Sequence, residues 1–155
     1  MQDASLFRPI LIFVALLAIA QAVLVGIDFI YPEISVPAFV NFLIVLLAAM
    51  ACGRVFAHMA KRLPTVGETL TFSAIAILLT LFVNVVFLAG TLIARGIPAT
   101  GDNLALWMAG STIEQPERAG FIMLGLAIAF GIGLLLGLAG FASGAWQALR
   151  ARHPA

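Results

Sequence analysis

The sequence has few charged residues and only one cysteine. Charged residues make up 10% of the 155 positions, and Cys52 is the single thiol. One cysteine excludes an intramolecular disulfide and a zinc site built on several thiolates. A net charge of +1 gives no reason to expect nucleic acid as a partner, because such binding needs a clustered basic face. The motifs HExxH, CxxC and GxSxG and a phosphate-binding glycine loop are also absent, so we expect no enzyme, no metal and no cofactor.

The chain is instead rich in apolar side chains. Hydrophobic residues make up 63% of it and the mean hydropathy is +1.16, whereas globular chains are roughly 45–50% apolar. Uncharged apolar runs of about 18 residues or more predict membrane spans, and a span that satisfies its own backbone in lipid is a helix. The sequence therefore predicts an all-α polytopic membrane protein, with one membrane domain over residues 1–155. Its four transmembrane helices would form an antiparallel bundle in the lipid bilayer, with spans at about residues 9–30, 37–59, 68–94 and 118–149.

The lysine and arginine residues between these spans predict the orientation. Cytoplasmic segments carry an excess of these residues. Two of them, Arg95 and Arg118, fall on one side of the membrane. Both termini are therefore expected in the cytoplasm, because the other side carries Arg8, Arg54, Lys61, Arg62, Arg150 and Arg152.

The segment 53–68 joins the second and third spans and contains a basic collar of Arg54, Lys61 and Arg62. The collar is interpreted as a topology signal that also attracts anionic headgroups, or as a docking surface for a partner. Thr65 and Glu68 have the spacing of a capping box at the start of the third span.

The outer loop, residues 95–117, is long for so small a protein. Within it, the run NLALWMA after Asp102 predicts a short interfacial helix that Asp102 caps and that contains Trp107. Glu114 completes a second cap signature before the fourth span. Asp102, Trp107 and Glu114 are the candidate contacts with a partner on this side.

No ionisable residue lies near the middle of a span, which argues against coupling to an ion or proton. The intramembrane polar residues are uncharged. Two hypotheses follow: these side chains hydrogen-bond across helices as glue, or they line a polar cavity or path. The residues are Gln21 in the first span and Ser73, Thr80, Asn84 and Thr91 on one face of the third.

The fourth span has a continuous stripe of small residues that includes Gly133, Gly137, Gly140 and Gly144. Glycines spaced in this way let two helix backbones approach closely in a membrane. The stripe therefore predicts a helix-packing face, whose partner is either another helix of this chain or a second copy.

The four-span layout and the hairpin GRVFAHMAKRLPTVGETLTF resemble a group of short bacterial inner-membrane proteins that has no known activity. The resemblance implies a bacterial cytoplasmic membrane and transfers no functional residue. We expect an accessory, structural or regulatory subunit that binds a larger membrane assembly through the fourth span and the outer loop. The alternative is a small oligomeric transporter or channel-like protein with an uncharged polar path.

Overall fold

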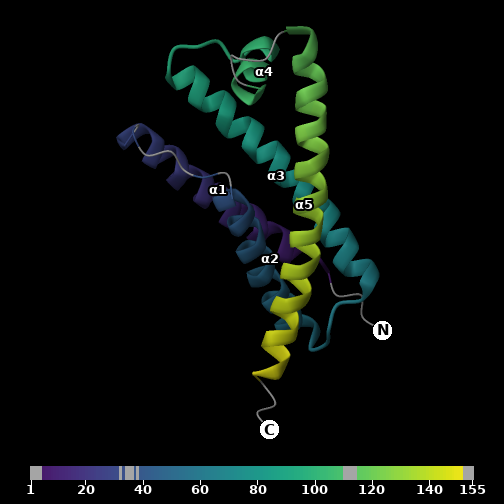
Figure 1. Ribbon diagram of the computed structural model, residues 1–155. Helices are drawn as coiled ribbons and strands as arrows, with labels where there is room; N and C mark the ends of the chain where they lie inside the picture. Colours follow the sequence, from purple (N-terminus) through teal and green to yellow (C-terminus); the bar gives the residue numbers. More distant parts are fainter. Residues whose placement is uncertain (1–4, 32, 34–36, 38, 110–114, 152–155) are drawn as a thin grey trace.

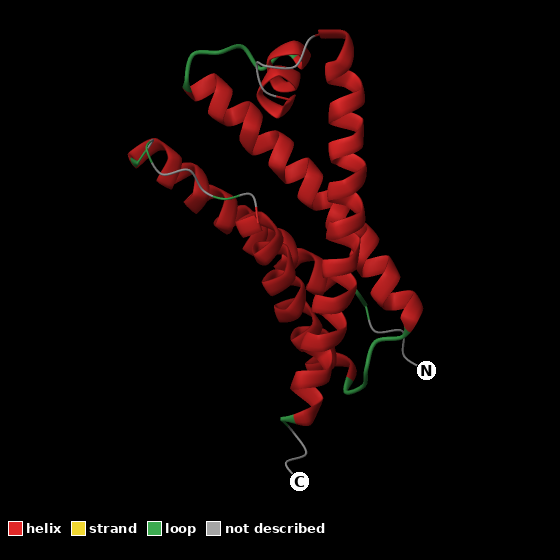
Figure 2. Ribbon diagram, in the orientation of Figure 1, coloured by secondary structure: helices red, strands yellow, loops and turns green. Residues whose placement is uncertain are grey.

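The described part of the chain folds into five helices. In the computed structural model, residues 5–31, 33, 37, 39–109 and 115–151 are described, except for the side chains of residues 107, 109 and 115–119. No strand occurs among these residues (Figure 2). The helices are α1 (Phe7–Ile30), α2 (Phe39–Ala60), α3 (Val66–Ala94), α4 (Gly101–Ala109) and α5 (Gln115–Arg150), labelled in Figure 1.

Four of these helices are long and apolar enough to cross a membrane, which confirms the prediction of an all-helical protein with four candidate spans. The bounds of α1, α2, α3 and α5 differ from the predicted spans by at most three residues. The predicted capping box at Thr65 and Glu68 is also confirmed. With 36 residues, α5 is about 54 Å long. It therefore exceeds a hydrocarbon core of about 30 Å.

The closest pair of helices is α2 and α5, and α5 also packs against α3, while α1 packs against α2 and α3. Along the α2–α5 contact, Gly140 lies against Leu46 and Gly144 lies against Met50. Residue numbers therefore rise together along both helices, so this pair runs parallel. Successive spans that alternate in direction also place the second and fourth in parallel, so this contact does not contradict the predicted bundle.

An aromatic cluster fills the core. Each spanning helix contributes one fully buried phenylalanine: Phe13, Phe56, Phe72 and Phe141. The rings of Phe72 and Phe141 are stacked with centroids 4.2 Å apart, and Phe13 meets the edge of Phe72 at 5.8 Å. Aromatic pairs with such geometry stabilise a core beyond the area that they bury. The cluster holds the four helices together in one half of the molecule.

The two ends of the molecule differ in packing. We call the end with the α2–α3 loop and the last turns of α5 the basic end, and the opposite end the α4 end. Figure 1 shows α3 and α5 crossing and then separating toward the α4 end. A Cβ atom added at Gly120, Gly125 or Gly131 of α5 would meet nothing within 4 Å. The glycines in the first part of α5 therefore face open space, although α4 contacts this helix.

Candidate functional site

The predicted glycine face of α5 is covered by this chain's own α2 and α3. A Cβ atom at Gly140 would lie 2.8 Å from the Leu46 carbonyl oxygen, and one at Gly144 would collide with the Met50 carbonyl. On the α3 side, Gly133 faces Ile77 and a Cβ at Gly137 would lie 3.1 Å from the Ser73 Cβ. This face is therefore not available as a contact surface for another protein.

The α2 side of this contact has its own glycine. A Cβ atom at Gly53 would collide with the Phe141 carbonyl oxygen and would lie 3.0 Å from the Ala145 nitrogen. Sequence reasoning missed Gly53. The signal was present, because Ala49, Gly53 and Ala57 repeat a small residue every four positions, as helix contacts in membranes do.

The hydroxyl groups of α3 are satisfied within their own helix. Ser73 donates to the Thr69 carbonyl at 2.8 Å, Thr80 to the Ala76 carbonyl at 2.8 Å and Thr91 to the Phe87 carbonyl at 2.9 Å. These are the backbone bonds that serine and threonine make four residues back in a helix. The three hydroxyls therefore form no glue between helices.

The amide groups belong to a site to which all four spans contribute. Gln21 Nε2 on α1 donates to Asn41 Oδ1 on α2 at 3.0 Å. Beside this pair lies a partly open cavity of about 220 Å³, which Thr80 and Asn84 of α3 and Gly133 of α5 also line. The structure thus brings Gln21, Thr80 and Asn84 together and leaves Ser73 and Thr91 outside the lining.

Asn41 is the lining residue that sequence reasoning did not single out. Its position in the sequence is of the same kind as those of Gln21 and Asn84, because all three are uncharged amides inside predicted spans. An amide in hydrocarbon costs several kcal/mol unless it finds a partner. The partner of Asn41 is Gln21, and the pair links α1 to α2.

Asn84 is half-buried, and its side chain makes no hydrogen bond to any described residue. It lies ten residues before the end of α3 at Ala94, and Gln21 lies nine residues before the end of α1 at Ile30. These distances are about 15 Å along a helix, or half of the hydrocarbon core. The lining contains no charged side chain. Asn84 thus offers to the cavity an uncharged amide that has no partner among the described residues.

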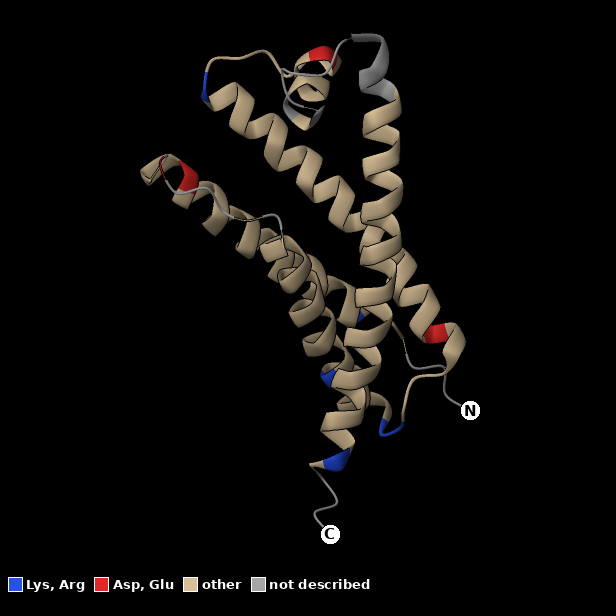
Figure 3. Cartoon of the chain, in the orientation of Figure 1, with Lys and Arg blue, Asp and Glu red and all other residues tan. Residues whose placement is uncertain are grey.

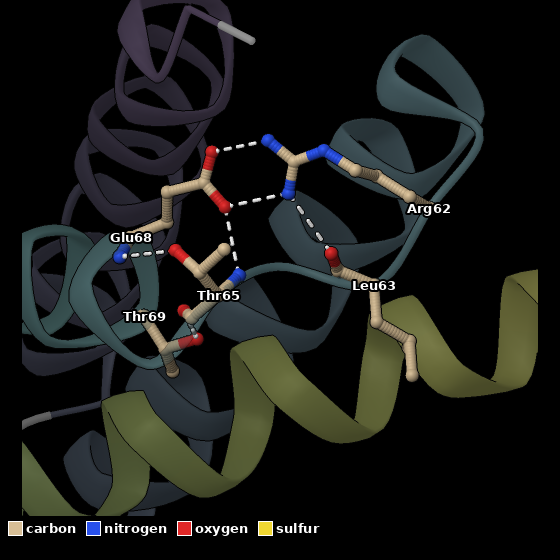
Figure 4. Close-up of polar contacts among 5 residues, drawn as sticks. All are labelled: Arg62, Leu63, Thr65, Glu68 and Thr69. Carbon is tan, nitrogen blue, oxygen red and sulfur yellow. Dashed lines mark hydrogen bonds and ion pairs between the residues drawn. The ribbon is translucent and has the colours of Figure 1, made fainter. Parts of the chain in front are cut away.

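Two residues of the basic collar bind within the chain. Arg62 donates to both carboxylate oxygens of Glu68, at 2.8 and 2.7 Å, and to the Leu63 carbonyl at 3.0 Å (Figure 4). Glu68 in turn accepts from the Thr65 nitrogen at 2.7 Å, and its own nitrogen donates to the Thr65 hydroxyl at 3.2 Å. Arg54 donates to Gln147 of α5 at 2.6 Å. These bonds fix the α2–α3 loop and tie α2 to the end of α5.

Lys61 has a positive φ of 53°, which ends α2 in the left-handed region. It is the third residue of the collar. Figure 3 shows basic residues gathered at the basic end, while the α4 end of α1 and of α3 carries one acidic and one basic segment. Those two segments are Asp28 and Arg95, which form an ion pair that joins α1 to α3.

The outer loop contains α4, but its cap is not the predicted residue. The Thr100 hydroxyl accepts from the Asn103 nitrogen at 3.3 Å, and Asn103 donates to the Pro98 carbonyl at 2.7 Å. The prediction that Asp102 caps this helix is therefore wrong, because the helix begins at Gly101, two residues before the predicted start at Asn103. Asp102 is exposed. The side chain of Trp107 and all of Glu114 lie outside the described residues.

Comparisons with known proteins returned no relative: the sequence matches no family model and no curated protein, and the structure matches no solved structure. Within the described residues, no group of three histidine, cysteine, aspartate or glutamate side chains is placed to hold a metal ion. The amide-lined cavity is therefore the candidate site on its geometry alone.

Proposed function

We propose that the protein is a small transporter-like membrane protein that binds an uncharged, hydrogen-bonding ligand in the cavity between its four spans. The observation that carries this proposal is the unpaired amide of Asn84 beside the Gln21–Asn41 pair. A polar group at this depth lacks the solvation of water, so a ligand or bound water that pairs with it gains binding free energy. The glycine face gives no comparable support to a role in a larger assembly, because α2 and α3 cover it.

Thiol labelling tests this proposal. On a Cys52→Ala background, a cysteine at Asn84 would face the cavity, whereas one at Phe82 would face lipid at nearly the same depth, because Phe82 is 66% exposed on the same helix. We expect a hydrophilic maleimide to label N84C about tenfold faster than F82C, since water does not enter the hydrocarbon. Equal rates at the two positions would contradict the proposal.

The proposed topology has both termini in the cytoplasm of a bacterial cell, with successive spans alternating in direction. The distribution of basic residues supports it, because the last turns of α2, the α2–α3 loop and the end of α5 contain Arg54, Lys61, Arg62 and Arg150. Figure 3 shows basic residues at this end. Fusion of a periplasm-active phosphatase after Arg150 should give an inactive reporter, and fusion in the loop after Gly96 an active one. The reverse pattern of reporter activity would place both termini on the periplasmic side.

A second candidate is an accessory subunit. One observation favours it: Met123, Leu124 and Ile128, on the first part of α5, are exposed although this part of the helix is apolar. A larger membrane protein could cover them in place of lipid. Purification in mild detergent tests this role, because a stable partner should be lost when Leu124 is changed to Trp but kept when the lipid-facing residue Phe82 is changed. A protein that purifies alone in both cases would contradict it.

A further inference from the structure

The amide-lined cavity has mixed walls. Besides its four polar residues, it is lined by Leu17, Phe42, Val45 and Leu81, which offer no side-chain hydrogen bond. A ligand with hydroxyls on every side would place some of them against these apolar residues. Each such hydroxyl would give up its hydrogen bonds to water without gaining a partner, at a cost of about 1–3 kcal/mol. The cavity therefore favours a ligand that is polar in one part and apolar in the rest.

The polar part of the lining offers both donors and acceptors. Beyond the Gln21–Asn41 bond, the Gln21 oxygen and the Asn84 oxygen can accept, while the Asn41 and Asn84 nitrogens can donate. The Thr80 hydroxyl already donates to Ala76, so its oxygen can only accept. A head group that carries both a hydroxyl and a carbonyl would use both kinds of group.

The absence of charge in the lining selects a neutral head. A phosphate or carboxylate that entered the cavity would lose its hydration without meeting a cation, and such a transfer is costly in a low-dielectric site. The basic residue nearest the α4 end of α3, Arg95, is held in the ion pair with Asp28. An anionic lipid head therefore has no partner in this cavity.

The size of the cavity means that only part of a lipid ligand can lie inside it. A cavity of about 220 Å³ holds a head group, since this is the volume of roughly seven water molecules, but it cannot hold two acyl chains. It lies between the predicted spans and is partly open, so the hydrocarbon chains of a bound lipid would remain outside it, in the bilayer.

We propose that the cavity binds the uncharged head of a neutral lipid, one that carries a hydroxyl and ester carbonyls as diacylglycerol does, with Asn84 as the residue that recognises the head. This inference rests on the proposed function, since it names the ligand class of the same site.

Ligand-induced stabilisation of the purified, full-length chain in detergent tests it. Dioctanoylglycerol should raise the unfolding temperature by about 5 °C at a hundredfold excess over its dissociation constant. Dioctanoylphosphatidic acid, which has the same chains and a charged head, should not do so. The shift should disappear in Asn84→Leu and in Asn84→Ala, and should persist in the lipid-facing control Val85→Leu.

Any of the following three outcomes would contradict the inference that the cavity binds a neutral lipid head. An equal shift with the charged lipid, or in both Asn84 variants, would mean that the lipids act as general amphiphiles. No shift with dioctanoylglycerol would exclude the neutral lipid head. A shift with free glycerol alone that depends on Asn84 would exclude a lipid and leave the proposed function standing. Failure of that function itself would appear separately, as equal labelling of N84C and F82C.

Discussion

The two halves of α5 differ in packing, although their sequences are similar in composition. Toward the basic end, Phe141 and Ala145 are fully buried, and Gly144 lies against the backbone of α2. Toward the α4 end, Met123 and Leu124 are exposed, and Gly125 and Gly131 face open space. Both halves are apolar and rich in glycine, so composition does not distinguish them. The difference shows that these glycines matter for packing only where a neighbouring helix meets them.

The cavity lies near the boundary between these halves, and this location accounts for its existence. Between α2 and α5 themselves, the close backbone contact leaves no room for a cavity at the basic end. Toward the α4 end, α3 and α5 separate (Figure 1). Where the close packing stops, the four helices leave room for about 220 Å³ among polar side chains.

The largest expected effect on stability is at the packed half of α5, near the basic end. Gly144→Ala would place a Cβ atom against the Met50 carbonyl, and we expect a loss of about 3 kcal/mol in the free energy of unfolding. Gly131→Ala is the control on the same helix, where a Cβ meets nothing and helix propensity improves. Unfolding in mixed micelles measures both. Similar stabilities for the two variants would remove the distinction between the halves.

The next effect concerns the cavity at the boundary. Gln21→Leu would leave the amide of Asn41 without its partner and should cost about 2 kcal/mol. Asn84→Leu removes an amide that has no partner among the described residues, so the stability should change by no more than about 0.5 kcal/mol. The same unfolding assay compares them. If Asn84→Leu were as damaging as Gln21→Leu, Asn84 would have a structural role.

A smaller effect is expected at the loop of the basic end. Thr65→Ala removes the hydroxyl that accepts from the Glu68 nitrogen, and the loss of such a cap costs about 1 kcal/mol. Glu68→Gln keeps an acceptor for the Thr65 nitrogen while weakening the pair with Arg62, so it serves as the milder matched variant. Thermal unfolding measures both, and an unchanged Thr65→Ala protein would show that the loop does not anchor this end.

The smallest effect is expected at the α4 end. The Asp28–Arg95 pair is partly exposed, with side-chain exposures of 45% and 35%, so solvent screens it. Asp28→Asn should cost about 0.5 kcal/mol, and salt should reduce that cost. A double-mutant cycle with Arg95→Gln isolates the pair. A coupling as large as the loss in Gly144→Ala would mean that the α4 end is held as firmly as the basic end.

Some features could be predicted because they are local. The helices follow uncharged runs that have no alternative in lipid, and the Thr65 capping box depends on residues three positions apart. The capping of α4 was predicted wrongly because Thr100 and Asp102 both have a suitable side chain, and the turn from Pro98 decides between them. The hydroxyls of Ser73 and Thr80 could have bonded within or between helices, and sequence does not separate these choices.

The sequence by itself determined that four helices form, where they begin and end, and which face of α5 is small, because backbone satisfaction in lipid and side-chain size act along a single helix. Only the tertiary structure decided that α2 and α3 fill this face, that α2 and α5 form the closest pair, and that Gln21, Asn41 and Asn84 meet in one cavity. The physical reason is that these contacts join residues far apart in the chain, and several partners of similar size and polarity compete for each of them.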